Sequence, residues 1–93
     1  MNSRVIVLFQ WNELTPEHYQ KVIETVEKND VPKDRILHCA GFHNNGLRVT
    51  DVWESAQAFD TFVKNSLMPI IGELGIKGQP AIEVFPLANL TYE

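Results

Sequence analysis

Residues 36–53 read ILHCAGFHNNGLRVTDVW, and this stretch decides the fold. The tetrapeptide HNNG at 43–46 separates two runs rich in apolar residues. Asn and Gly tolerate the positive φ angles of a tight turn, so the pattern is typical of a β-hairpin. We therefore predict two antiparallel strands, one over Ile36–Phe42 and one from Gly46 or Leu47 to Trp53.

The residues before this hairpin predict a further strand and a helix. Arg4–Gln10 is short, rich in β-branched residues and apolar at both parities, which is typical of a strand buried on both faces. Thr15, Pro16 and Glu17 favour the start of a helix, because they supply a cap, a preset φ angle and a negative charge. This helix should end within Asn29–Pro32, because proline cannot continue it.

The residues after the hairpin repeat the pattern of one helix and one strand. Ser55 is the expected N-cap of a second helix, and Gly75 is the expected residue after its end. Pro69 lies inside this helix, so we expect a kink or a short break near Asn65-Ser66. The last strand is predicted over Ala81–Phe85.

The predicted order β-α-β-β-α-β is that of the α+β ferredoxin-like plait, with two helices on one face of a four-stranded antiparallel sheet. The length of 93 residues suits a single domain over 1–93. The face of the sheet that the helices leave open is also rich in apolar residues. We therefore expect a symmetric homodimer that packs sheet against sheet.

Composition limits the class of partner and the compartment. The net charge is −4, and such a surface repels phosphate backbones, so we expect no nucleic-acid partner. No apolar run has the length of a signal-peptide core or a membrane span, so we expect no membrane partner. The single cysteine, Cys39, excludes an internal disulfide, and the expected location is the cytoplasm.

Several short segments resemble the dimeric α+β barrel superfamily, and within it the antibiotic-biosynthesis-monooxygenase-like (ABM-like) domains. They are VWES at 52–55, AF at 58–59, Phe62, HCAG at 38–41 and IEVFP at 82–86. The resemblance covers nearly the whole chain and implies the plait fold and a sheet-to-sheet dimer. It leaves the reaction open, because this superfamily includes cofactor-free oxygenases, haem-degrading enzymes, isomerases and proteins without known activity.

The haem-degrading branch does not match this chain at its ligand position. The resemblance would place the iron-binding histidine on the second helix, but residues 56–74 contain no histidine. We therefore expect no cofactor. We also expect no metal, because Cys39 points to the opposite face of the sheet from His38.

The hairpin predicts which polar side chains meet. If Asn44-Asn45 forms the loop, His38 pairs with Asp51 and Ile36 with Trp53. If Asn45-Gly46 forms it, His38 faces Trp53 and Asp51 is diagonal to it. In both registers His38, Asp51 and Trp53 lie on one face. The resemblance at Trp53 implies that this face is the one toward the helices.

These residues suggest a catalytic pair in an aromatic pocket. His38 is the candidate general base and Asp51 its orienting partner, with Trp53, Tyr19 and Phe42 as substrate-binding walls. The resulting hypothesis is a homodimeric cofactor-independent monooxygenase or isomerase that acts on a small aromatic or apolar substrate. The alternative is a non-catalytic dimer that binds a small ligand or has a structural or stress-related role, with the pair as a buried polar couple. A cavity of about 300 Å³ or more beside His38 would favour the first hypothesis or a ligand-binding module, whereas a filled helix–sheet interface would favour the structural role.

Overall fold

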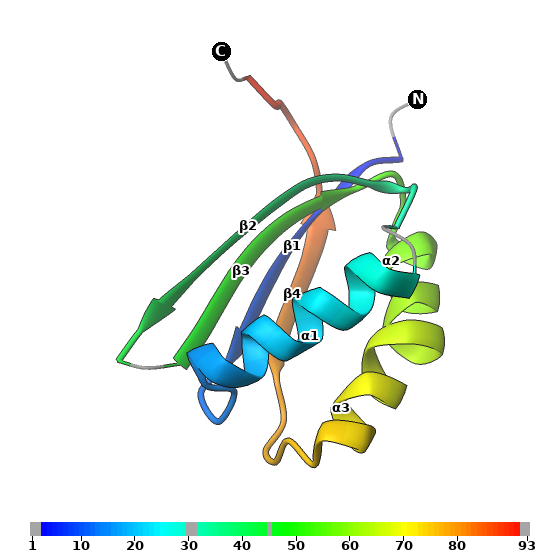
Figure 1. The fold of residues 1–93 in the computed structure, drawn as a ribbon. Coiled ribbons are helices and arrows are strands. Elements are labelled where there is room, and N and C mark those ends of the chain that lie inside the picture. The colour runs from blue at the N-terminus through cyan, green and yellow to red at the C-terminus, as the bar shows by residue number, and fades with distance from the viewer. Residues whose placement is uncertain (1–2, 30–31, 45, 92–93) are drawn as a thin grey trace.

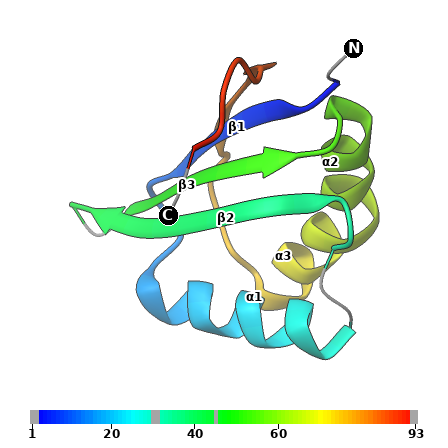
Figure 2. The same cartoon turned by 90° about the horizontal axis from the view of Figure 1, so that it is seen from above.

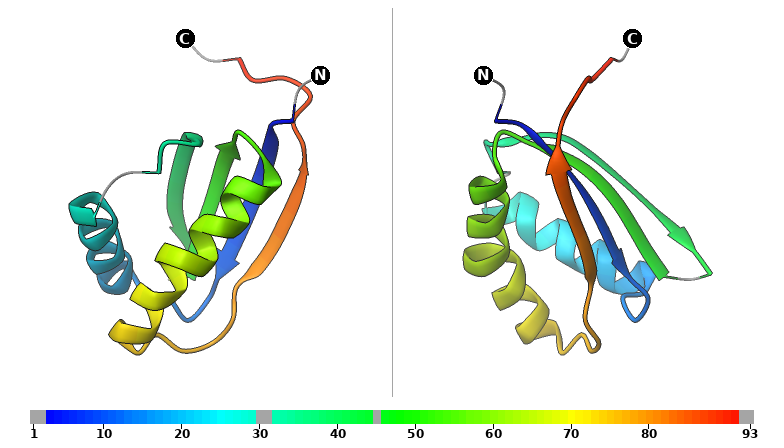
Figure 3. Two further views of the ribbon diagram at one scale, coloured as in Figure 1. Left: turned by 90° about the vertical axis from the view of Figure 1, so that its right-hand side faces the viewer. Right: turned by 180° about the vertical axis from the view of Figure 1, so that it is seen from behind.

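The computed structural model describes residues 3–29, 32–44 and 46–91, and it confirms the predicted order of elements. The strands and helices alternate as β1 (Val5–Trp11), α1 (Pro16–Asn29), β2 (Arg35–His43), β3 (Gly46–Trp53), α2 (Ala56–Phe62), a π-helical segment η1 (Val63–Leu67), α3 (Met68–Leu74) and β4 (Ala81–Pro86). The strands form one antiparallel sheet in the order β2-β3-β1-β4 (Figure 1). The helices all lie on one face of this curved sheet (Figure 2 and Figure 3).

The register of the central hairpin follows the first of the two predicted alternatives. His43 pairs with Gly46 and His38 pairs with Asp51, so the loop is the Asn44-Asn45 pair. Asn44 has a φ angle of 53°, in the left-handed region that asparagine tolerates; Asn45 lies outside the described residues. The predicted pairing of Ile36 with Trp53 is wrong. A register shift between Arg35 and Leu37 brings Arg35 opposite Trp53 instead.

The helix ends follow local chemistry. Ser55 caps α2, because its hydroxyl oxygen accepts a hydrogen bond of 3.0 Å from the backbone N–H of Ala58. The predicted break before Pro69 is present as the π-helical segment η1, which contains Asn65 and Ser66. Gly75 ends α3 with a φ angle of 68°. The predicted end of α1 is confirmed at Asn29; the next two residues, Asp30 and Val31, lie outside the described residues.

The hydrophobic core lies between the helices and one face of the sheet. It takes alternate residues of β1, of which Val7 and Trp11 are almost completely buried. On the other face Ile6 and Leu8 are only half-buried. The prediction that the first strand is buried on both faces is therefore wrong for the single chain, because the helices can cover only one side.

The edge strand β4 is uncovered along its whole length. All six of its residues are exposed, and it lies beyond the helices at the margin of the sheet (Figure 3). The register with β1 places Val84 on the face of Val7 and Phe85 on the face of Ile6. Ile82, Val84 and Phe85 keep 40%, 42% and 40% of their surface exposed, so the strand presents large apolar side chains on both faces.

Candidate functional site

The site is built on the cross-strand pair of His38 and Asp51. Both lie on the helix-facing side of the sheet, and the ring nitrogen Nδ1 of His38 is 2.6 Å from Oδ1 of Asp51. Asp51 is only 5% exposed, and among the described residues no other charged side chain is buried. A carboxylate in this environment must be hydrogen-bonded or paired, because burial of even a neutral polar group without a partner costs about 2–7 kcal/mol. The register of the hairpin supplies the partner.

The second oxygen of Asp51 is occupied by Trp53. The indole Nε1–H donates a hydrogen bond of 3.1 Å to Oδ2 of Asp51, two residues back along β3 on the same face. Trp53 is 1% exposed, and its ring packs against Phe59 and Phe62 of α2. These contacts hold the indole in place, so the carboxylate is oriented from one side by Trp53 and meets His38 with its other oxygen.

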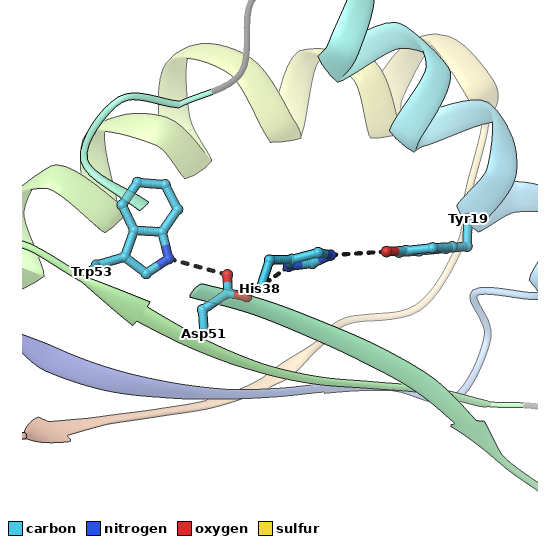
Figure 4. A network of polar contacts seen from close by, with 4 residues as sticks. All are labelled: Tyr19, His38, Asp51 and Trp53. Carbon is cyan, nitrogen blue, oxygen red and sulfur yellow. Dashed lines mark hydrogen bonds and ion pairs between the residues drawn. The ribbon is translucent and has the colours of Figure 1, made fainter. Parts of the chain in front are cut away.

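Tyr19 completes the network from the other layer of the fold. Its hydroxyl lies 2.8 Å from Nε2 of His38, and the two rings lie end to end with nearly parallel planes, at an interplanar angle of 13° (Figure 4). Phe42 contacts the Tyr19 ring edge to face at a centroid distance of 5.7 Å. Helix α1 therefore brings Tyr19 onto the ring nitrogen of His38 that does not face Asp51. Sequence reasoning made Tyr19 a pocket wall and missed this polar contact.

The direction of each hydrogen bond follows from the chemistry of the partners. An ionised carboxylate only accepts, and an indole nitrogen only donates. With a neutral imidazole, Nδ1 of His38 must therefore carry the proton that faces Asp51, and Nε2 is the acceptor. The Tyr19 hydroxyl then donates to Nε2. The chain of donors runs from Tyr19 to His38 to Asp51, while Trp53 donates to Asp51 from the opposite end.

Electrostatics keep Tyr19 in its protonated form. Burial raises the pKa of the Tyr19 phenol above its ordinary value of 10.0, and the negative charges of Asp51 and Glu27 act in the same direction. The positive charge of Arg35 opposes them and lowers the pKa of Tyr19. At neutral pH Tyr19 is therefore a hydrogen-bond donor, as the network requires.

The network opens onto a cavity between the helices and the sheet. Its volume is about 60 Å³, and its walls are mainly apolar side chains, with Tyr19, Arg35, His38 and Asp51 as the polar exceptions. The volume is well below the roughly 300 Å³ at which ligand pockets of drug-like size begin. The volume that would favour a preformed ligand pocket is therefore not reached; the helical side of the cavity is lined by side chains of α1, α2, η1 and α3.

Two of the predicted pocket walls lie elsewhere. Among the described residues that line the cavity, neither Trp53 nor Phe42 occurs. Trp53 lies behind Asp51 and is sealed by α2, and Phe42 lies against Tyr19 with 40% of its surface exposed. Arg35 does line the cavity and was missed. The position of Arg35 depends on the register shift at the start of β2, and residue types alone give no signal for that shift.

The remaining histidines and the cysteine lie apart from this network. His18 interacts with Thr15 at the start of α1, and its Nδ1 is 3.4 Å from the Thr15 nitrogen. His43 is exposed at the hairpin, and Cys39 is an exposed free cysteine. Within the described part of the chain, no three His, Cys, Asp or Glu side chains are grouped to hold a metal ion.

Comparisons of sequence find no relative, whereas comparisons of structure find many. No protein-family model matches the chain, and no curated protein matches it. The solved structure of a variant of SnoaB, a cofactor-independent oxygenase from Streptomyces nogalater, superposes with a TM-score of 0.69 and 14% identity, over 98% of this chain and 99% of that one.

Two further solved structures are similar over nearly their whole length. Rv0793 from Mycobacterium tuberculosis has a TM-score of 0.71 and 12% identity, over 96% of this chain and 100% of that one. A candidate antibiotic biosynthesis monooxygenase from Caulobacter crescentus CB15 has a TM-score of 0.66 and 12% identity, over 95% and 92% of the two chains. The chain therefore shares the fold of these solved structures, a ferredoxin-like four-stranded antiparallel sheet with the helices on one face.

Proposed function

We propose that this chain is a cofactor-independent enzyme of the oxygenase or isomerase kind, which removes a proton from a small, weakly acidic organic substrate. The observation that carries the proposal is the hydrogen-bonded series Tyr19–His38–Asp51 at the wall of an apolar cavity. The fold shared with a cofactor-independent oxygenase supports it. In this proposal His38 takes up the proton that leaves the substrate, and Asp51 orients His38.

The arrangement of the pair has the features that proton abstraction needs. Asp51 fixes the tautomer of His38 and stabilises the imidazolium that forms when the ring takes a second proton. Removal of a proton from a phenol or an enol gives an electron-rich anion. In a cofactor-independent oxygenase that anion reacts with O₂, and in an isomerase it takes a proton at another carbon.

The cavity limits how a substrate binds. About 60 Å³ accommodates only a few non-hydrogen atoms, whereas a cavity of about 150 Å³ holds a benzene ring. An aromatic substrate therefore inserts its acidic group beside Tyr19 and His38, and the side chains at the mouth shift to accept the ring. His38 keeps 23% of its side chain exposed, which supports access from solvent to this end of the network. Side-chain shifts of this kind are common on binding.

The proposed assembly is a homodimer through the open face of the sheet. That face carries Ile6, Leu8 and Phe85, and it contains a hollow of about 440 Å³ bordered by Arg48 and Glu83. A second copy related by a two-fold axis would bury these apolar side chains and bring oppositely charged residues to the same interface. The proposed location is the cytoplasm, where reducing conditions keep an exposed thiol such as Cys39 free.

None of the described helices is long and apolar enough to cross a membrane.

The second candidate function is a non-catalytic dimer that binds a small ligand. The observation that favours it is the complete mutual satisfaction of the Tyr19–His38–Asp51–Trp53 network.

Turnover separates the two functions. We would incubate the protein with a panel of small phenols, hydroquinones and enolisable ketones, and follow O₂ consumption and product by mass spectrometry. The enzyme proposal expects turnover that falls by about 10²–10⁴-fold in His38→Gln. His43→Gln, which changes an exposed histidine outside the network, is the matched control. Tight binding without turnover in the wild-type protein would favour the ligand-binding module.

A further inference from the structure

The nitrogen atom through which His38 would act as a base is already occupied. Nδ1 of His38 faces Asp51 at 2.6 Å, and Nε2 faces the Tyr19 hydroxyl at 2.8 Å. A substrate can reach a lone pair of His38 only if Tyr19 moves away. The Tyr19 oxygen, in contrast, donates its one proton to His38 and retains acceptor capacity on its own oxygen.

We propose that Tyr19, rather than His38, is the catalytic residue that exchanges a proton with the substrate, and that His38 and Asp51 act on the substrate through it. This inference rests on the proposed function, since it assigns the residue in contact with the substrate at the same site. The preferred substrate is a weak acid whose acidic group becomes an oxyanion, such as a phenol or an enol.

The proton transfer balances without any further group. The substrate O–H gives its proton to Oη of Tyr19, and the original hydroxyl proton of Tyr19 passes to Nε2 of His38. The products are a substrate oxyanion, a neutral Tyr19, a His38 imidazolium and an ionised Asp51. His38 and Asp51 then form a buried ion pair with a hydrogen bond already in place, and such charge-assisted bonds are stronger than neutral ones.

The charges around the cavity favour this product. At rest the network carries one buried negative charge, on Asp51. When His38 takes up one proton, the net charge of the network becomes zero. Arg35 lines the same cavity as Tyr19, and its positive charge favours an oxyanion on either the tyrosine or the substrate. Glu27 acts in the opposite direction on Tyr19. The network therefore supplies the acceptor, and Arg35 supplies the counter-charge for the substrate anion.

The geometry also explains why Tyr19 is held in position. Its ring meets Phe42 edge to face. The ring lies end to end with that of His38 in nearly the same orientation, so the hydroxyl is aligned with Nε2 (Figure 4). Helix α1 anchors the residue through Val22 and Val26, which are 6% and 5% exposed and lie in the core. Aromatic contacts of this kind strengthen the packing beyond the effect of burial alone. A tyrosine that served only as a wall would not need its hydroxyl on the histidine.

The experiment uses 4-nitrophenol as the probe, because its ionised and protonated forms absorb at different wavelengths. At a pH below the pKa of the free probe, we expect the wild-type protein to bind it as nitrophenolate. Tyr19→Phe removes only the hydroxyl and keeps the ring, and we expect it to lower the ratio of ionised to protonated bound probe by at least about tenfold, which corresponds to one pKa unit. His38→Gln should do the same, and His43→Gln should not.

The outcomes separate this inference from the proposed function. If wild-type protein ionises the probe and Tyr19→Phe does so equally well while His38→Gln does not, His38 acts directly and the inference is overturned. If wild-type protein binds the probe without ionising it, or does not bind it, the proposed function fails and the inference with it. Circular dichroism and the thermal midpoint of Tyr19→Phe establish that the variant is folded, and Tyr19→Leu, which also removes the ring, should lose ionisation as well.

Discussion

His38 and Asp51 lie opposite one another on β2 and β3, and the 2.6 Å contact between Nδ1 and Oδ1 joins a partly exposed imidazole to a nearly buried carboxylate. The contact depends on a two-residue loop at Asn44-Asn45, because a slip by two residues would bring Trp53 opposite His38. It gives the histidine a defined tautomer, with the proton on Nδ1 and the lone pair directed at Tyr19. The chemistry of the site depends on that tautomer.

Asp51→Asn should reverse the tautomer of His38. The indole of Trp53 can only donate, so the amide oxygen of the substituted side chain must face Trp53 and its NH₂ group must face His38. Nδ1 then has to accept, and the ring proton moves to Nε2, where it points at Tyr19. Nitrogen-15 NMR of the imidazole should show the Nδ1–H tautomer in wild-type protein and the Nε2–H tautomer in the variant.

The same variant tests whether the pair has a role beyond stability. If ligand binding and turnover are unchanged in Asp51→Asn and only the thermal midpoint falls, the pair is structural. Retention of the Nδ1–H tautomer would show that the hydrogen-bond directions assigned to this network are wrong.

Trp53→Phe should destabilise the protein more than Trp11→Phe. Both indoles are 1% exposed and both donate, but Trp53 donates to the carboxylate of Asp51, whereas Trp11 donates at 2.9 Å to the neutral backbone carbonyl of Lys77. Loss of a partner costs about 1–3 kcal/mol for a buried neutral group and more for a charged one. Urea denaturation of the two variants gives the comparison; equal losses would mean that the bond from Trp53 to the carboxylate stabilises the protein no more than the bond from Trp11 to a neutral carbonyl.

Tyr19→Phe should change how stability depends on alkaline pH. The pKa of Tyr19 is raised in the folded protein, so above the unfolded value of 10.0 the unfolded chain releases this proton while the folded protein retains it. The free energy of unfolding therefore falls as pH rises from about 10 toward the folded pKa, by the linkage between proton binding and stability.

The phenylalanine variant lacks this contribution, so its loss of stability above that pH should be shallower than that of wild-type protein. The measurement is a series of urea denaturations across the alkaline range. Well below the unfolded pKa of 10.0 the difference between the two proteins should be constant, because Tyr19 is protonated in both states. A difference that stays constant through the whole range would contradict the raised pKa.

Phe85→Asp should give a monomer, and Val84→Asp should not. The two residues are neighbours on β4 with nearly equal exposure, 40% and 42%, but the register places Phe85 on the open face and Val84 on the helix-facing side. A buried aspartate in a sheet-to-sheet interface would be costly without a partner. Light scattering at micromolar concentration reports the mass; a monomeric wild-type protein, or loss of the dimer in Val84→Asp alone, would refute an interface on the open face.

Features that depend on local chemistry can be read from the residue types alone. The turn within 43–46, the cap at Ser55 and the end of the helix at Gly75 follow from what each residue type permits at a turn or a helix end. The shared face of His38, Asp51 and Trp53 also follows, because side chains alternate along a strand and both possible two-residue loops keep these three on one side. The structure selects the register in which His38 pairs with Asp51.

The group that covers the other nitrogen of His38 cannot be read from the residue types, because it depends on how the layers pack. The distance between Tyr19 and His38 depends on how α1 packs on the sheet, and this follows from many core contacts together rather than from any local pattern. The same holds for the bulge that moves Arg35 opposite Trp53, and for the size of the cavity. The volume of a cavity depends on how the side chains of the two layers interdigitate, and the residue types alone do not specify this. A pocket of about 60 Å³ and one of about 300 Å³ are therefore compatible with one sequence pattern.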